Sequence, residues 1–158
     1  MIEIFTDGST RPTNPGPSGY GIAWYQDGKS FMEQSGFLGD DLTNNIAEYV
    51  ALIVALKSLH EFQDMNVVIR SDSMLVVKQV SGLWRVKQPH LRGLYEEAIK
   101  LRTAHQKVGR YITLKHVKAH VGIAGNERAD DLALKAVLNR TLCSKWILDL
   151  VSEVREAA

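Results

Sequence analysis

Hydrophobic and polar positions alternate along the first quarter of the chain in the pattern typical of β-strands. A period-two pattern over residues 2–7 predicts a first strand that ends near Asp7. Residues 8–19 are rich in Gly, Pro, Ser, Thr and Asn, which predicts a loop, and a second strand is expected over residues 20–25. The Asp27-Gly28 pair indicates a hairpin turn, so a third strand should follow through about Leu38.

The rest of the chain mixes helical periodicity with short apolar runs. Thr43 stands where an N-cap is expected, ahead of an apolar helix, and a cap at residues 71–73 precedes a second helix. Residues 67–69 form the short apolar run of a strand buried on both faces. Another strand is expected over 111–114, and further helices over 90–106, from about 126, and over 144–154.

This order of elements predicts an α/β fold in which a meander is extended by strand–helix crossovers. The expected sheet has five strands, three antiparallel and two parallel, flanked by helices. We expect residues 1–140 to form one domain and residues 141–158 to form an amphipathic helix packed on it.

Composition narrows the class of protein. With 158 residues, 45% hydrophobic and 23% charged, one compact domain with a proper core is expected, and intrinsic disorder is excluded. The one cysteine, Cys143, excludes an intramolecular disulfide and a multi-cysteine zinc site. There is no apolar run of about 18 residues and no signal-peptide pattern at the start, so we expect a monomeric cytoplasmic protein without membrane association.

The charge is unevenly distributed although the net charge is +1. Residues 1–77 carry 4 Lys and Arg against 10 Asp and Glu, residues 78–118 carry 10 against 2, and residues 119–158 carry 5 against 6. A basic middle segment beside acidic ones favours a surface that meets a polyanion next to a site that holds cations. The alternative is that the basic positions are the solvated face of one helix.

Four acidic residues stand where a packed fold would bring them together: Asp7, Glu48, Asp72 and Asp130. Asp7 and Asp72 end strands, and the other two lie in the first turns of helices, so all four should meet at one rim of the sheet. A single acid at such a place is commonly a cap, but Glu48 is flanked by apolar residues and should face a crowded site. Carboxylates in such a group repel one another unless cations neutralise them, and Mg²⁺ suits these ligands.

Several short motifs, taken together, resemble type 1 ribonuclease H, in the variant form that lacks a basic protrusion. The resemblance runs in order over about residues 1–137. It is carried by FTDGS at 5–9, NPGP at 14–17, TNNIAE at 43–48, SDS at 71–73, HVKAH at 116–120 and NERAD at 126–130.

This resemblance implies an endonuclease that cuts the RNA strand of RNA–DNA hybrids by a two-metal-ion displacement, leaving 5′-phosphate and 3′-hydroxyl ends. It implies that Asp7 bridges both ions and that Asp130 helps to hold the ion that activates water. Glu48 and Asp72 would help to hold the ion at the leaving oxygen. Mg²⁺ is the expected cofactor, with Mn²⁺ as a substitute. His120 is implied in proton transfer or product release, although an exposed loop histidine is commonly without function.

Further residues are expected around the hybrid, in which the 2′-hydroxyl distinguishes RNA from DNA. The uncharged groups beside the acids suit the reading of that hydroxyl, and Thr43 could both cap its helix and touch a DNA phosphate. Glu127 is implied in product release, or is an ordinary acid of a first helical turn. The expected substrate-binding residues near the acids are Gly8, Ser9, Asn14, Thr43, Asn44, Asn45, Ser73 and Asn126.

The segment GLWRVKQPH at 82–90 leads directly into a helix, where many bacterial relatives insert a basic protrusion. Trp84, Arg85, Lys87 and Gln88 are therefore expected to contact the DNA strand, although Trp84 could equally be a core anchor. Asp41 lies two residues before Thr43, near the expected DNA phosphate, where an acid opposes binding.

Three alternatives remain open at this point. A proofreading-type exonuclease of the same superfamily expects an acid where Ser9 stands, and a catalytically silent hybrid-binding module usually lacks one of the four acids. The stripe of Trp146, Ile147, Leu150, Val151 and Val154 should pack on the domain, or bind a partner protein of DNA replication.

Overall fold

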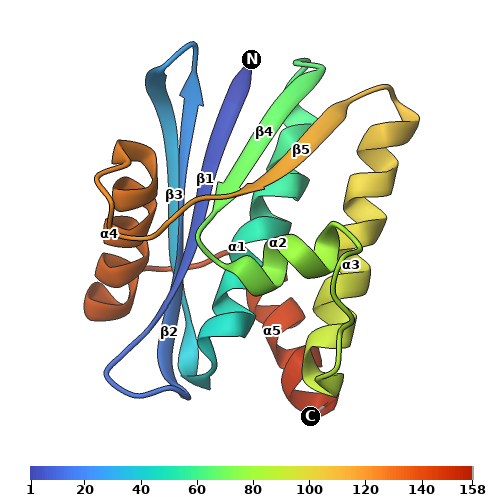
Figure 1. Cartoon of the computed structure of the whole chain (residues 1–158). Helices are drawn as coiled ribbons and strands as arrows, with labels where there is room; N and C mark the ends of the chain where they lie inside the picture. The colour runs from blue at the N-terminus through green and yellow to red at the C-terminus, as the bar shows by residue number, and fades with distance from the viewer. Residues whose placement is uncertain (158) are drawn as a thin grey trace.

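The computed structural model describes residues 1–157 and contains a five-stranded mixed sheet in the order β3-β2-β1-β4-β5 (Figure 1). β1, β2 and β3 form an antiparallel meander, and β4 and β5 lie parallel to β1, which confirms the predicted mixed α/β sheet. The strand bounds are β1 Ile2–Thr10, β2 Gly16–Gln26, β3 Lys29–Leu42, β4 Asn66–Ser71 and β5 Tyr111–His116.

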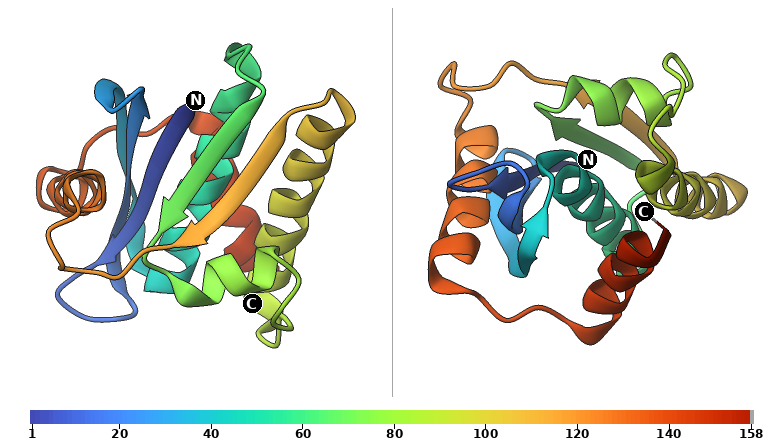
Figure 2. Two further views of the ribbon diagram at one scale, coloured as in Figure 1. Left: turned by 45° about the horizontal axis from the view of Figure 1, so that its top comes forward. Right: turned by 90° about the horizontal axis from the view of Figure 1, so that it is seen from below.

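Helices cover both faces of the sheet. α4 lies alone against one face over β1 and β2, whereas α1 lies against the other face with α3 and α5 outside it (Figure 2). The helix bounds are α1 Asn44–Ser58, the short 3₁₀ turn η1 Leu59–Glu61, α2 Met74–Val80, α3 Pro89–Lys107, α4 Ala124–Asn139 and α5 Lys145–Ala157. Among these helices none combines the length and apolar character needed to cross a bilayer.

The core is divided by the sheet. Ile2 and Ile4 point into the main core around α1, whereas Phe5 packs with Ala23 and Ala129 beneath α4, as the alternation along a strand requires. Every residue of α1 from 46 to 56 is buried, because this helix lies between the sheet and the outer helices. The central position of α1 explains why its sequence is apolar on nearly all sides.

The prediction of a loop over residues 8–19 is wrong at both ends. Residues 8–10 continue β1 and residues 16–19 begin β2, with Gly8 opposite Tyr20 and Thr10 opposite Ser18. The small polar residues that suggested a loop pair across the strands instead, since the Thr10 and Ser18 hydroxyls lie 2.7 Å apart. β3 also runs past the predicted end near Leu38 to Leu42, with irregular pairing near Ser18.

The C-terminal segment packs on the same body as the rest of the chain. The Thr141 carbonyl accepts a hydrogen bond of 2.8 Å from the Phe37 amide of the edge strand β3. α5 then buries Ile147, Val151 and Val154 in the main core. Three residues of the predicted stripe are therefore used within the molecule, and Trp146 and Leu150 pack partly against the same core.

Candidate active site

Three carboxylates meet where β1, α1 and β4 come together. Oxygen atoms of Asp7, Glu48 and Asp72 all lie within 4.8 Å of one another. Asp7 and Glu48 are 4% and 7% exposed, and Asp72 is half-buried. Such a group of hard oxygen ligands is suited to a divalent cation.

The close packing of α1 on β1 explains the position of Glu48. A Cβ atom on Gly8 would lie 2.5 Å from the backbone of Ala47 and Glu48, so the helix reaches the strand only because residue 8 is glycine. Thr43 caps α1, with its hydroxyl oxygen accepting a 3.3 Å hydrogen bond from the Ile46 amide. The cap and the glycine together bring Glu48 beside Asp7.

α4 brings the fourth predicted acid to the same place from the other face of the sheet. A Cβ atom on Gly21, which lies opposite Asp7 in the ladder, would be 2.3 Å from the Ala129 carbonyl oxygen. Asp130 follows Ala129 and contributes to raising the pKa of Asp7 through a side-chain hydrogen bond. Asp130 thus borders the cluster but is not one of the three whose oxygen atoms all lie within 4.8 Å.

Burial and mutual repulsion disfavour the ionised forms of these acids. Burial, followed by the charge of Glu48, raises the pKa of Asp7 far above its ordinary value. Burial also raises the pKa of Glu48, against the opposing effect of hydrogen bonds from Asp7 and the Gly8 backbone. Burial likewise raises the pKa of Asp72. Without a cation, the cluster therefore favours shared protons over full ionisation.

Two buried polar atoms beside the cluster lack a hydrogen-bond partner. They are Oε2 of Glu48 and Oδ1 of Asn126, a residue that is 3% exposed and whose side chain also hydrogen-bonds to Asp72. Buried oxygen atoms without partners are costly, and both are good ligands for a hard cation or its water. The residues present therefore fit the predicted divalent cations.

His120 and Glu127 are the two residues expected to assist proton transfer and product release. His120 is exposed and has a left-handed backbone, and its charge lowers the pKa of Asp72, which places the imidazole close to the cluster. Glu127 is exposed in the first turn of α4. Both side chains are therefore open to solvent.

The predicted neutral residues lie in β1, in the loop after it and at the starts of α1 and α2. Asn14 and Asn44 bind each other reciprocally, since the Asn14 amide donates to the Asn44 side chain over 2.8 Å and its oxygen accepts from the Asn44 backbone over 3.2 Å. Ser73 caps α2, accepting a 3.3 Å hydrogen bond from the Val76 amide. Asn45 is half-buried, whereas Ser9 is 7% exposed and so has little surface to offer a ligand.

Residues 81–88, the basic segment that holds Trp84, Arg85, Lys87 and Gln88, form a turn between α2 and α3. Only residues 81–88 separate these helices, so there is no protruding helix in this part of the described chain. Trp84 is 50% exposed, which excludes the core-anchor alternative, and Arg85, Lys87 and Gln88 are exposed as well. The Arg85 carbonyl is held by the Gln79 side chain over 3.2 Å, so the segment is anchored rather than free.

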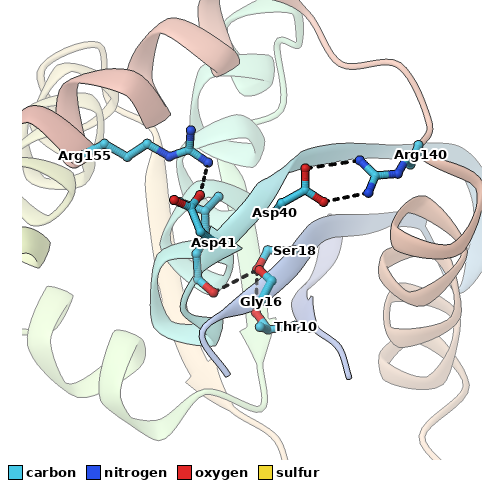
Figure 3. Close-up of polar contacts among 8 residues, drawn as sticks. Thr10, Gly16, Ser18, Asp40, Asp41, Arg140 and Arg155 are labelled. Atoms are coloured by element: carbon cyan, nitrogen blue, oxygen red, sulfur yellow. Dashed lines mark hydrogen bonds and ion pairs between the residues drawn. The ribbon is translucent and has the colours of Figure 1, made fainter. Parts of the chain in front are cut away.

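Sequence reasoning missed two ion pairs at the end of β3. Arg140 binds Asp40 through both terminal nitrogens, at 2.6 and 3.4 Å, and Arg155 of α5 binds Asp41 (Figure 3). The members of each pair are 100 and 114 residues apart, so no local pattern could have revealed them. Asp41 is thus not the uncompensated acid that the sequence indicated.

Comparison with known proteins gives consistent matches. A family model described as RNase H matches residues 1–138. Ribonuclease H of Pseudomonas putida is 35% identical over 144 residues, covering 86% of this chain and 93% of that protein. A bifunctional protein of Mycobacterium tuberculosis is 37% identical over 108 residues, which are 68% of this chain and 29% of that much longer relative. The solved structure of LC11-RNase H1 in complex with an RNA/DNA hybrid has a TM-score of 0.73 and 36% identity, covering 88% of this chain and 98% of that one.

Proposed function

The chain belongs to the ribonuclease H family, and from this membership we propose that it hydrolyses the RNA strand of RNA–DNA hybrids as an endonuclease. The observation that carries the proposal is the group of three carboxylates, two buried and one half-buried, whose oxygen atoms lie within 4.8 Å of one another. An acidic cluster of this kind cannot itself bind a polyanion, so it requires cations between protein and phosphate.

The residues that would hold two divalent cations, Mg²⁺ or in its place Mn²⁺, are Asp7, Glu48, Asp72 and Asp130. When bound, such ions activate a water nucleophile and stabilise the leaving 3′-oxygen, which gives 5′-phosphate and 3′-hydroxyl ends. Asp7 is the central member, because Glu48, Asp72 and Asp130 all contribute to raising its pKa. The side chain of Asn126 holds Asp72 in place through a hydrogen bond.

The exposed groups beside the cluster would handle protons and product. The exposed imidazole of His120 acts on Asp72, whose pKa it lowers, so His120 is suited to moving a proton during turnover. Glu127, exposed at the start of α4, would assist release of the cleaved phosphate. Neither residue is among the three clustered carboxylates.

Neutral side chains would supply discrimination between RNA and DNA. The linked amides of Asn14 and Asn44 lie at the start of α1, the helix that carries Glu48, and they can donate and accept hydrogen bonds with 2′-hydroxyls. Gly8, Asn45 and Ser73 would add contacts from neighbouring elements, and Ser9 would contribute only through the small part of its surface that is exposed. The exposed Trp84, Arg85, Lys87 and Gln88 would bind the DNA strand by stacking and by neutralising phosphates.

We extend the proposal to the organisation of the molecule. Residues 1–140 would be the catalytic domain, and residues 141–158 would be a segment that belongs to the same domain. The protein would act as a cytoplasmic monomer in DNA replication.

The proposal is tested with internally labelled RNA–DNA hybrid, double-stranded RNA and double-stranded DNA, each incubated with Mg²⁺ and with EDTA. Cleavage of the RNA strand of the hybrid with Mg²⁺ alone, giving fragments with 5′-phosphates, is the expected result. Comparable cleavage of double-stranded RNA, or full activity in EDTA, would refute it. Asp131→Asn is a matched control for the acids, because Asp131 lies on the surface of α4 in ion pairs with Arg128 and Lys135.

A further inference from the structure

The C-terminal helix α5 lies beyond the residues that match the family, which end at 138, yet its end lies beside the residues that precede α1. It runs antiparallel to α1. Near its beginning, Trp146 lies under the Lys57 ammonium, 4.1 Å from the ring centroid, at the last turn of α1. Near its end, Arg155 binds Asp41, two residues before the Thr43 cap of α1 (Figure 3). The end of α5 therefore places the positively charged side chain of Arg155 near the start of α1, the helix that carries Glu48.

The Arg155 guanidinium lies beside Gly39 of β3. Gly39 adopts φ +148°, and a Cβ atom there would lie 2.4 Å from an Arg155 terminal nitrogen. The glycine thus leaves the space in which the guanidinium lies, between the end of β3 and Asp41. The single hydrogen bond to Asp41 leaves other donors of the guanidinium for a further acceptor. A side chain placed in this way is prepared to bind an anion while it neutralises an acid.

Arg155 also lines a hollow of about 360 Å³ with Asp41, Thr43 and His90. On one side of this hollow is the start of α1, where Asn44 is exposed, and on the other is the start of α3, directly after the basic segment. Both borders carry residues proposed to contact the hybrid. The hollow therefore lies between two groups of substrate contacts.

We propose that Arg155 is a substrate-binding residue through which the C-terminal helix takes part in holding a phosphate of the hybrid beside Thr43. This inference rests on the proposed function. Asp41 alone would repel a phosphate at this place, and the ion pair with Arg155 removes that repulsion. The remaining donors of Arg155 then add a phosphate contact of the kind for which arginine is suited.

Kinetics of hybrid cleavage at several salt concentrations test the inference. Arg155→Gln should raise KM about three- to tenfold and flatten the dependence of log KM on log salt by about one unit, with kcat unchanged. Arg155→Lys should retain part of the affinity because it keeps the charge. Adding Asp41→Asn to Arg155→Gln should restore part of the loss, because the uncompensated acid is then gone.

Arg140→Gln is the matched control. It breaks the neighbouring pair with Asp40, which is also exposed and also ties the C-terminal segment to β3. It should leave KM and the salt dependence unchanged. If Arg155→Gln and Arg140→Gln change KM equally, or if Arg155→Gln alters only the melting temperature, Arg155 is structural and the inference is overturned. A wild-type protein that does not cut hybrids would instead overturn the proposed function.

Discussion

Two clusters of buried polar side chains lie at opposite ends of β4, and they differ in whether their atoms have partners. At the carboxyl end, Asp7, Glu48 and Asp72 form a group in which Oε2 of Glu48 has no hydrogen-bond partner. Before the amino end, the buried side chains of His105 and Arg110 bind each other at 2.8 Å, and neither has a buried atom without a partner among the described residues.

The polar atoms of the second cluster all have partners, because backbone carbonyl oxygens accept hydrogen bonds from both side chains. Arg110 donates to the carbonyl oxygens of Phe62 and Asp64, the latter over 2.8 Å. His105 lies 2.6 Å from the Leu56 carbonyl, which can only accept, so its Nε2 carries the proton and its Nδ1 accepts from Arg110. The difference teaches that a closed polar network stabilises the fold, whereas an open one is prepared for ligands.

The largest effect is expected from Asp7→Asn, which changes the open cluster. A metal site supplies several kcal/mol of transition-state stabilisation, so hybrid cleavage should fall by roughly 10³-fold or more. Circular dichroism should show a folded protein, because the new side chain is isosteric. Initial rates under saturating hybrid check the prediction, and a near-native rate would show that Asp7 is not a metal ligand.

Arg110→Met should have the next largest effect, and on stability rather than rate. It removes the donors to two buried carbonyls and to His105, so the free energy of unfolding should fall by about 2–4 kcal/mol. Urea denaturation measures this, with the exposed Lys107→Met as control. The kcat of the folded variant should equal that of the wild type. A loss of activity without a loss of stability would remove the distinction between the two clusters.

The open cluster should also destabilise the metal-free protein. Asp7→Asn in EDTA at pH 7 should raise stability by about 1–2 kcal/mol, or roughly 2–8 °C in Tm, by relieving carboxylate repulsion. The pKa of Asp7 is raised in the fold, so the native state binds more protons and the free energy of unfolding of the wild type should fall as pH rises above the ordinary carboxyl range.

Thermal melts at several pH values measure the effect of the substitution and the pH dependence, and Mg²⁺ should raise the Tm of the wild type more than that of Asp7→Asn. Equal Tm values for the two proteins in EDTA would contradict the prediction.

The smallest effect concerns the closed cluster in acid. Burial lowers the pKa of His105, and the His60 and Arg110 charges act in the same direction against the hydrogen bond to the Leu56 carbonyl, which raises it. In acid the unfolded chain therefore binds a proton at His105 more readily than the native state does. The free energy of unfolding should fall by up to about 1 kcal/mol as pH drops below 6.5. His105→Gln should remove this part of the pH dependence in urea titrations at pH 7.5 and 5.5. Parallel pH profiles for both proteins would show that His105 does not titrate differently on folding.

Local patterns predicted the parts of this molecule that depend on neighbouring residues. The order of elements along the chain, the Thr43 cap and the mixed sheet of five strands follow from periodicity and capping chemistry, whereas the spatial order of the strands was not predicted. The error at residues 8–19 has the same origin, since glycine and serine indicate a loop locally, whereas here they allow helices to pack closely on β1 and β2.

Tertiary pairings were beyond the reach of such patterns. Asp41 looked unfavourable because its partner, Arg155, stands 114 residues later in the chain. The bond between His105 and Arg110 spans five residues, but its meaning depends on carbonyls of residues 56, 62 and 64, which the sequence does not bring near. The roles of the individual site residues stay predictions, since the geometry gives their positions and not their chemistry.

Gly21 determines how closely α4 can approach β2, and thereby where Asp130 lies relative to Asp7. It lies directly across the ladder from Asp7, and a methyl group there would stand 2.3 Å from the Ala129 oxygen and 2.6 Å from the Ala133 nitrogen. These are backbone atoms, so the whole of α4 would have to move outward, and Asp130 would move with it. A substitution far from any reacting atom would thereby change the spacing between carboxylates that approach from two faces of the sheet. Substitutions at this position of β2 are thus limited by the spacing of the carboxylates that they would change, in addition to the stability of the fold.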